Sequence, residues 1–464
     1  MDFIPNRFTL NCFALNHTMH RLILTLVSLL LTSSLAWAED LLQIYELAQV
    51  NDTKIQAARE GLCATQELYP QARALFFPMV NTTASGTAYN KKYDANQITV
   101  SNLTIPLIQN HFLYDQSVVA LNFSQPVFYY QQWVELAKAN EQIKQANAAY
   151  VAAEQDLIVR TVQRYLNILR AIDNLKFAKA QRKAFSEILN QTNQTYAAGI
   201  SPLTNVQFAK ARYDNAHAQE ITAENELANQ KELLEEITGE TIETYALLNN
   251  CLRLEAPQPS DVELWVDEAL EHNYNLQAAR FLVEAAREDI RLTQAGHLPT
   301  ININGSVVRS SSANDLFPTP KNTNAYVGVQ LAMPIYSGNS VVSKTRQVAH
   351  LYEQSRKQME TIYRQVKSNT RQAFLGVQTQ ISQAKAFKQA IESNTIALKA
   401  ADESFKAGIL TIVDVLNAQS DLTKSQQDYS NARYDYIVQS ILLKQAAGTL
   451  SPADINKINC WLKK

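Results

Sequence analysis

The sequence predicts a mixed α and β membrane protein, in which each chain contributes four strands to a shared β-barrel and long α-helices to a coiled-coil barrel. Three features predict this fold: a very long helix, short segments of alternating polarity before it, and a second copy of the whole arrangement. Residues 127–198 contain neither glycine nor proline, and good helix formers dominate them. As one helix they would reach ~105 Å, about three times the thickness of a bilayer core. A globular core does not need a helix this long.

The composition excludes several classes of function. The chain has 464 residues, of which 19% are charged, and its formal net charge of -2 argues against nucleic-acid binding by bulk electrostatics. The 11 glycines are too widely spaced for a phosphate-cradling loop or a dinucleotide fingerprint. The 7 histidines form no His-Glu-x-x-His motif, and Gly-x-Ser-x-Gly is missing too. We therefore expect no enzyme, no cofactor and no metal site.

The N-terminus has the pattern of an export signal. Residues 22–31 form an apolar run after the basic Arg21, and Ala36-Trp37-Ala38 has the small-x-small form of a cleavage site. Residues 1–38 are thus a signal peptide with an N-terminal extension, since residues 1–18 precede the signal proper. The apolar run is too short to cross a bilayer, and no later segment approaches about 18 consecutive apolar residues. We expect an exported protein without a transmembrane helix.

The mature chain contains an internal repeat, in which the same landmark residues occur twice in the same order. Ile55-Gln56-Ala57-Ala58-Arg59 recurs as Leu276-Gln277-Ala278-Ala279-Arg280, and later landmarks recur in the same order. Gly199 and Gly239 return as Gly408 and Gly448. Each copy is one large supersecondary unit rather than a short solenoid module. The predicted structural repeats are residues 39–250 and 251–464.

Each repeat is expected to hold a helix, a strand pair, a long helix and a return helix. The long helix has apolar residues at coiled-coil steps of four and three. A capping box, Ser260-x-x-Glu263, is predicted to open the first helix of the second repeat, and Pro70 to kink or end its counterpart in the first. In the first repeat the expected elements are 41–74, strands 79–89 and 117–128, long helix 129–198 and return helix 203–238. In the second they are 260–295, strands 300–309 and 326–335, long helix 339–407 and return helix 412–447.

The strands have one apolar and one polar face. Val327, Val329 and Leu331 alternate with Gly328 and Gln330, which is the period of a strand. The polar segments 90–116 and 310–325 are predicted to be surface loops. Four strands cannot close a barrel, because about eight are the practical minimum. Several copies that pool their strands would close one in the bacterial outer membrane, and three copies would supply twelve.

Three motifs point to a known family: Gly296-His297-Leu298-Pro299-Thr300, Thr411-Ile412-Val413-Asp414-Val415-Leu416 and Asn431-Ala432-Arg433-Tyr434. In these motifs and in its repeat, the chain resembles the TolC-type outer membrane efflux proteins, which are trimeric channel-tunnels. The resemblance covers nearly all of the mature chain. It implies a homotrimer in outer membrane lipid with a periplasmic α-helical tunnel. It also implies a periplasmic adaptor (membrane fusion) protein and an inner-membrane translocase of the RND, ABC or MFS type as partners in efflux or type I secretion. Drugs, toxic small molecules or proteins would be the substrates.

The resemblance also implies a gate at the helix tips, where the turns at Gly199 and Gly408 dock the adaptor. The family carries two acidic residues one helical turn apart after the second turn, and this chain keeps Asp414 but has Asn417 at the second position. Three copies of Asp414 would form an acidic ring that favours cations, and the like charges act to raise the pKa of the ring. Thr204 is kept as well.

The charged latch of the family cannot form in this chain. Phe405, Leu410 and Asn205 stand where the family has a tyrosine, an arginine and a further aspartate. We hypothesise that the gate closes by packing and amide hydrogen bonds, with Phe405 and Leu410 as candidates. The alternative is that these two side chains only pack the helix tips.

Two further alternatives remain open from the sequence. A periplasmic adaptor or a fibrous adhesin would explain the helices and the signal, but not the symmetric strand segments. Among the cysteines of the mature chain, Cys251 and Cys460 hold matching positions in the two repeats, so they are either bonded to each other or free. The odd count of three, with Cys63, argues against a disulfide framework.

Overall fold

The computed structural model describes residues 40–92, 97–106, 111–249, 252–314 and 321–462. The predicted signal peptide and extension, residues 1–38, lie outside the described residues. The chain divides into two compact units. One unit comprises residues 64–145 and 280–358 and is called the sheet unit here. The other comprises 1–63, 146–279 and 359–464 and is called the helical unit.

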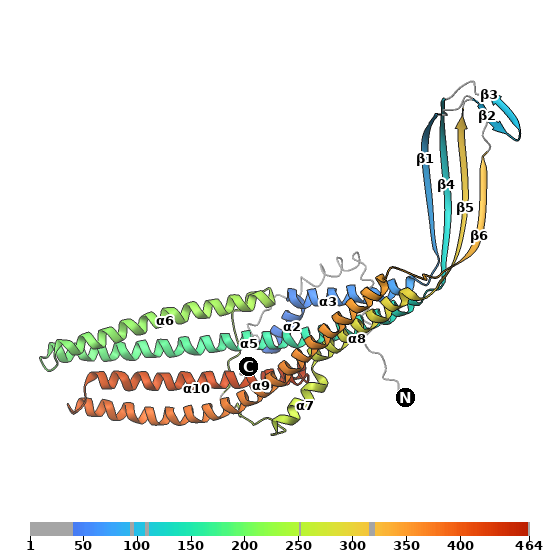
Figure 1. Ribbon diagram of the computed structural model, residues 1–464. Helices are drawn as coiled ribbons and strands as arrows, with labels where there is room; N and C mark the ends of the chain where they lie inside the picture. The colour runs from blue at the N-terminus through green and yellow to red at the C-terminus, as the bar shows by residue number, and fades with distance from the viewer. Residues whose placement is uncertain (1–39, 93–96, 107–110, 250–251, 315–320, 463–464) are drawn as a thin grey trace, which may run out of the picture. The chain divides into compact units, whose positions relative to one another are not determined.

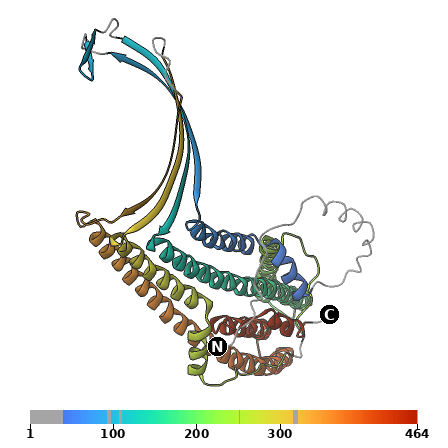
Figure 2. The same cartoon turned by 90° about the vertical axis from the view of Figure 1, so that its right-hand side faces the viewer.

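The sheet unit contains one four-stranded antiparallel sheet in the order β1-β4-β5-β6 (Figure 1). Figure 2 shows that the four strands bend together along their length. One row of the register places Val80 beside Phe123, then Gly305, then Val327. The four strands are β1 (Met79–Lys92), β4 (His111–Phe128), β5 (Thr300–Asn314) and β6 (Asn322–Ala332).

The strands extend well into the segments predicted to be loops. The expectation of surface loops over 90–116 and 310–325 is therefore wrong in part, because polar and Thr-rich residues also form strands where a neighbouring strand supplies hydrogen bonds. Within the first segment, β2 (Gln97–Val100) and β3 (Leu103–Pro106) form a separate hairpin. β6 also begins before the predicted 326 and ends at Ala332, because Pro334 has no N–H to continue the ladder.

The two faces of the sheet differ as predicted. Val119, Leu121 and Val329 are exposed apolar residues on one face. On the other face polar side chains bond across the strands: Ser124 Oγ donates to Asn304 Oδ1 at 2.9 Å. Ser306 Oγ donates to Asn122 Oδ1 at 2.9 Å, and Asn304 Nδ2 to Gln330 Oε1 at 3.0 Å.

The helical unit is built on two antiparallel helix hairpins (Figure 1). The first joins α5 (Tyr130–Ala197) to α6 (Leu203–Thr238), and the second joins α9 (Ser340–Lys406) to α10 (Ile412–Ala446). α6 has the predicted bounds and α10 ends one residue earlier than predicted, while α5 and α9 each begin one residue later and end one residue earlier than predicted. Of the described helices, none is both long and apolar enough to cross a membrane.

Each predicted first helix is interrupted at a side-chain cap. At Asp52 the backbone turns extended, and the carboxylate accepts from the Ile55 N–H at 3.3 Å. The backbone is also extended at Asn273, whose Oδ1 accepts a hydrogen bond from the Leu276 N–H at 3.1 Å. The first break separates α2 (Leu41–Asn51) from α3 (Thr53–Gln66), and the second separates α7 (Val262–His272) from α8 (Tyr274–Gln294).

Pro70 has the predicted effect, and the predicted capping box does not form. α3 ends at Gln66, the residue whose carbonyl a non-proline at position 70 would have bonded, and α4 (Leu68–Ala74) follows. The cap of α7 is Asp261, which accepts from the Glu263 N–H at 3.0 Å, rather than Ser260. Asp261 lies immediately before the first helical residue, where a short carboxylate reaches the N2 donor.

The cysteines correct the sequence analysis. Cys460 is a free thiol, so a Cys251–Cys460 bond is wrong, and Cys251 itself lies outside the described residues. Cys63 is disulfide-bonded, which the sequence analysis did not predict.

The core of the helical unit lies where α5 and α10 meet α2, α11 (Pro452–Asn459) and the segment after α6. Tyr165, Leu169 and Ile437 are completely buried there. Tyr165 OH donates to the Ala246 carbonyl at 2.7 Å, which satisfies its one polar group. This core fixes the two hairpins against each other at one end, and their turns lie at the other end of the helices.

Candidate functional site

The two hairpin turns have the same backbone structure. Ile200 N–H bonds to the Thr195 carbonyl at 2.9 Å, and Ile409 N–H bonds to the Ser404 carbonyl at 2.9 Å. Gly199 and Gly408 occupy the left-handed region with φ of 74° and 76°. This is the Schellman motif that the glycine positions predict at a helix C-terminus. The motif leaves Ile200 79% and Ile409 77% exposed, so both turns present an isoleucine to their surroundings.

Asp414 caps the start of α10. Its Oδ2 accepts from the Thr411 hydroxyl at 2.6 Å and from the Thr411 backbone N–H at 2.9 Å. These hydrogen bonds favour the charged form and lower the pKa of the Asp414 carboxyl within one chain. The pKa increase expected from an acidic ring requires three copies side by side and stays a prediction.

Asn417, one turn further along α10, accepts a hydrogen bond from the first hairpin. Arg212 on α6 donates from Nη2 to Asn417 Oδ1 at 2.9 Å, and both residues are exposed. Sequence reasoning missed Arg212. The repeat offered no signal for it, because the offset that relates Gly199 to Gly408 aligns Arg212 with Asp421 rather than with Asn417.

A small apolar cluster joins the hairpins close to the turns. Phe405 is half-buried against it, whereas Leu410 is 39% exposed and is not a member. The structure therefore separates two residues that the sequence analysis treated together. The buried members of this tip cluster are Phe185, Ala216, Ile412 and Leu416, with Ile188, Tyr213 and Val413 packed against them.

The two remaining predicted gate residues lie in the first turn of α6. Thr204 is exposed. Asn205 Nδ2 donates to Ser201 Oγ at 3.0 Å, which keeps its amide bonded within its own hairpin. Neither residue is brought to Asp414 by a hydrogen bond that the structure shows in one chain.

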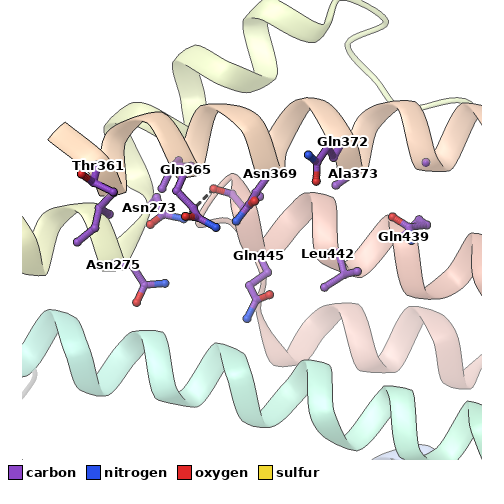
Figure 3. Close-up of a pocket in the computed structure, with 14 residues that line it drawn as sticks. Asn273, Asn275, Thr361, Gln365, Asn369, Gln372, Ala373, Gln439, Leu442 and Gln445 are labelled. Atoms are coloured by element: carbon purple, nitrogen blue, oxygen red, sulfur yellow. Dashed lines mark hydrogen bonds between the residues drawn. The ribbon is translucent and has the colours of Figure 1, made fainter. Parts of the chain in front are cut away.

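A separate hollow lies between the start of α8, α9 and α10 (Figure 3). It has a volume of about 790 Å³, and none of its 14 lining residues is titratable. Asn273 Nδ2 donates to the Ala446 carbonyl at 2.9 Å at its edge. Acid–base or nucleophilic chemistry needs an ionisable or activated group, so this lining supports no catalysis. Its amides are Asn273, Asn275, Gln365, Asn369, Gln372, Gln439 and Gln445.

Among the described residues, no group of three or more His, Cys, Asp or Glu side chains could hold a metal ion.

Comparison with known proteins places the chain in a family. The family model described as outer membrane efflux protein matches residues 44–240 and 265–449. The outer membrane protein TolC of Vibrio cholerae serotype O1 is 33% identical over 93% of this chain and 95% of its own length. The alkaline protease secretion protein AprF of Pseudomonas aeruginosa is 27% identical over 95% of this chain and 91% of its own length.

Solved structures show the same fold. The outer membrane protein VceC from Vibrio cholerae superposes with a TM-score of 0.73 at 20% identity, covering 89% of this chain and 99% of that one. The CmeC outer membrane channel of Campylobacter jejuni superposes with a TM-score of 0.76 at 15% identity, covering 92% and 90%. The chain therefore belongs to the outer membrane efflux protein family, and it is an outer membrane channel for efflux or secretion.

Proposed function

We propose that three copies of this chain close a twelve-stranded barrel in the outer membrane, and that their helices form a gated periplasmic tunnel. The observation that carries this proposal is the pair of open sheet edges. β1 and β6 are the outer strands, and since the four strands alternate in direction, β1 and β6 run in opposite directions. β6 of one copy can therefore pair antiparallel with β1 of the next, and closure removes every edge.

The faces of the sheet support the same assembly. An exposed apolar face is stable against lipid, and the face with Asn122, Ser124 and Asn304 suits a water-filled lumen. Each chain would supply its strands and helices as two structural repeats, 39–250 and 251–464. The matching caps at Asp52 and Asn273 support this duplication.

The channel would work with partners on its periplasmic side. We assign it to a tripartite efflux or type I secretion system, with a periplasmic adaptor at the turns of Gly199 and Gly408 and an inner-membrane translocase of the RND, ABC or MFS type. The exposed Ile200 and Ile409 give these turns an apolar contact for the adaptor. The names of relatives support both routes, since they include a secretion protein and the outer membrane efflux protein BepC of Brucella suis. Drugs, toxic small molecules or proteins would pass through.

The gate would lie at the helix tips, with Asp414 as an acidic ring and closure by packing and amide hydrogen bonds. Phe405 supports the packing, because it contacts the tip cluster that holds α10 to the first hairpin. Asn417 supports the amide bonding. Leu410, Thr204 and Asn205 lie close to the turns in sequence, and their part in closure depends on neighbouring copies.

Single-channel conductance of the purified mature protein in a planar bilayer tests this function. We expect an SDS-resistant trimer with small, stable, cation-preferring openings. The Phe405→Ala, Leu410→Ala double variant should open more readily, because it removes packing from the tips. Ile396→Ala is the matched control, since Ile396 is an exposed apolar residue on α9 outside the tip cluster. A protein that never inserts contradicts the barrel, and a double variant that opens no more easily than wild type contradicts the packed gate.

A further inference from the structure

Among the described residues, Arg212 makes the polar side-chain bond between the two hairpins that lies nearest to their turns. Its Nη2 lies 2.9 Å from Asn417 Oδ1. Gln427 Nε2 donates to Asn174 Oδ1 at 2.9 Å, but Gln427 lies further from the turn at Gly408. The Asp173 carboxylate, further still, accepts from Ser430 Oγ at 2.6 Å and from Tyr434 OH at 2.8 Å.

Different polar contacts hold the helices together at different points along the hairpins. Within the first hairpin, ion pairs bind α5 to α6, as between Lys179 and Glu224 at 3.1 Å and between Arg182 and Glu220. Arg212 lies on α6 but is directed to α10 instead of α5. In the described part of the chain, the Arg212–Asn417 hydrogen bond and the tip cluster hold α10 against α6 near the turns.

We propose that Arg212 is a positioning residue of the gate, which holds α10 in the closed position through Asn417. This inference rests on the proposed gate at the helix tips. Asn417 and Asp414 are three residues apart on one helix, so they lie on the same side of α10. A bond that restrains Asn417 therefore also restrains Asp414. Arg212 does not touch the solute; it acts on the position of the acidic residue.

The chemistry of the pair is suited to a releasable contact. A guanidinium is always charged and presents several donors, and an amide oxygen is a neutral acceptor. The bond is exposed and competes with water, so it is weak enough to break when the hairpins move apart. Replacing Asn417 by aspartate would convert it into an ion pair, which is stronger than the bond to a neutral acceptor.

The test is single-channel recording of Arg212→Ala, Asn417→Asp and the swapped pair Arg212→Asn with Asn417→Arg. We expect Arg212→Ala to raise the open probability about fivefold, the effect of losing a hydrogen bond of ordinary strength. Asn417→Asp should lower it below wild type, and only while Arg212 is present. The swapped pair should restore wild-type closure, which a merely structural surface residue would not do. The control is Lys210→Ala, which removes the same charge from an exposed position on the same helix.

The outcomes separate this inference from the gate itself. If Phe405→Ala, Leu410→Ala opens the channel and Arg212→Ala does not, the tips are the gate and the role of Arg212 is overturned. If Arg212→Ala opens the channel and Lys210→Ala does not, the positioning role of Arg212 is supported, even if the Phe405→Ala, Leu410→Ala variant stays closed. Equal effects of Arg212→Ala and Lys210→Ala would show a general charge effect and overturn the proposal. SDS-resistant trimer content confirms that each variant has assembled.

Discussion

Arg160 on α5 and Asp52, at the break between α2 and α3, form an ion pair with Nη2 2.7 Å from Oδ2. Asp52 is 3% exposed, and Arg160 also bonds Asp156 at 2.7 Å. The same Asp52 carboxylate caps α3 through the Ile55 N–H. One side chain thus ends one helix, starts the next and attaches both to the long helix.

Asp52→Asn should destabilise the protein by about 2 kcal/mol, because it removes the charge that balances the half-buried Arg160 guanidinium. Burial acts to raise the pKa of Asp52, but the hydrogen bond and charge of Arg160 and two backbone N–H groups outweigh it and lower the pKa. A lowered pKa stabilises the fold above the unfolded value of about 3.9, and the stabilisation is lost as the pH falls through the folded pKa. Thermal unfolding of both proteins from pH 7 to pH 3 measures this.

The difference between wild type and Asp52→Asn should therefore shrink in acid. Arg287→Ala is the control, because Arg287 pairs with Glu284 at 3.5 Å with both side chains about half exposed, and such pairs contribute little. A difference between Asp52→Asn and wild type that stays constant down to pH 3 would contradict the assigned role of the ion pair.

Gly448→Ala should lower the free energy of unfolding far more than Gly199→Ala, although φ is 73° at Gly448 and 74° at Gly199. A Cβ at Gly448 would lie 2.3 Å from the His272 carbonyl oxygen, whereas a Cβ at Gly199 has nothing within 4 Å. Gly199→Ala then loses about 1 kcal/mol, the cost of a left-handed residue. Gly448→Ala adds a clash with backbone and should exceed about 3 kcal/mol. Melting temperatures of the two variants measure the difference, and similar values would refute the crowding at His272.

Asp414→Asn should abolish the cation preference of the channel, because it removes the charge of the proposed ring. A carboxyl is charged above its pKa, and the Thr411 hydrogen bonds lower the pKa of Asp414. In wild type the cation preference should thus persist to low pH. In Thr411→Val, which lacks the hydroxyl donor, the preference should disappear at a higher pH than in wild type. Reversal potentials in a salt gradient between pH 7 and pH 3 measure both.

The comparison of wild type with Thr411→Val stays valid when the three carboxylates of a ring repel one another. That repulsion raises the pKa of Asp414 by the same amount in both proteins. Thr395→Val is the matched control, an exposed threonine on α9 outside the proposed gate, whose hydroxyl donates to the Ile391 carbonyl. Unchanged selectivity in Asp414→Asn would place the narrowest charged point of the channel elsewhere.

The sequence alone predicted the long helices well and the shorter ones poorly. α6 and α10 begin after turns that the glycines Gly199 and Gly408 predict. No proline interrupts α5 or α9, so their length could be predicted as well. The breaks at Asp52 and Asn273 were missed, since a single Asp or Asn within an otherwise helical pattern caps a helix only where tertiary contacts hold its backbone extended. Here the partners are remote, such as Arg160 for Asp52 and Ala446 for Asn273.

The sequence by itself determined the repeat, the alternating strands, the glycine turns and the family. These depend on local periodicity and on residue types that a single segment carries. Only the tertiary structure decided that Phe405 packs on the tip cluster while Leu410 does not, and that Arg212 meets Asn417. The physical reason is that contacts between helices depend on how each helix is rotated about its axis and shifted along it. In this protein the core around Tyr165 and Ile437 sets that rotation and shift, at residues far from the tips in the sequence.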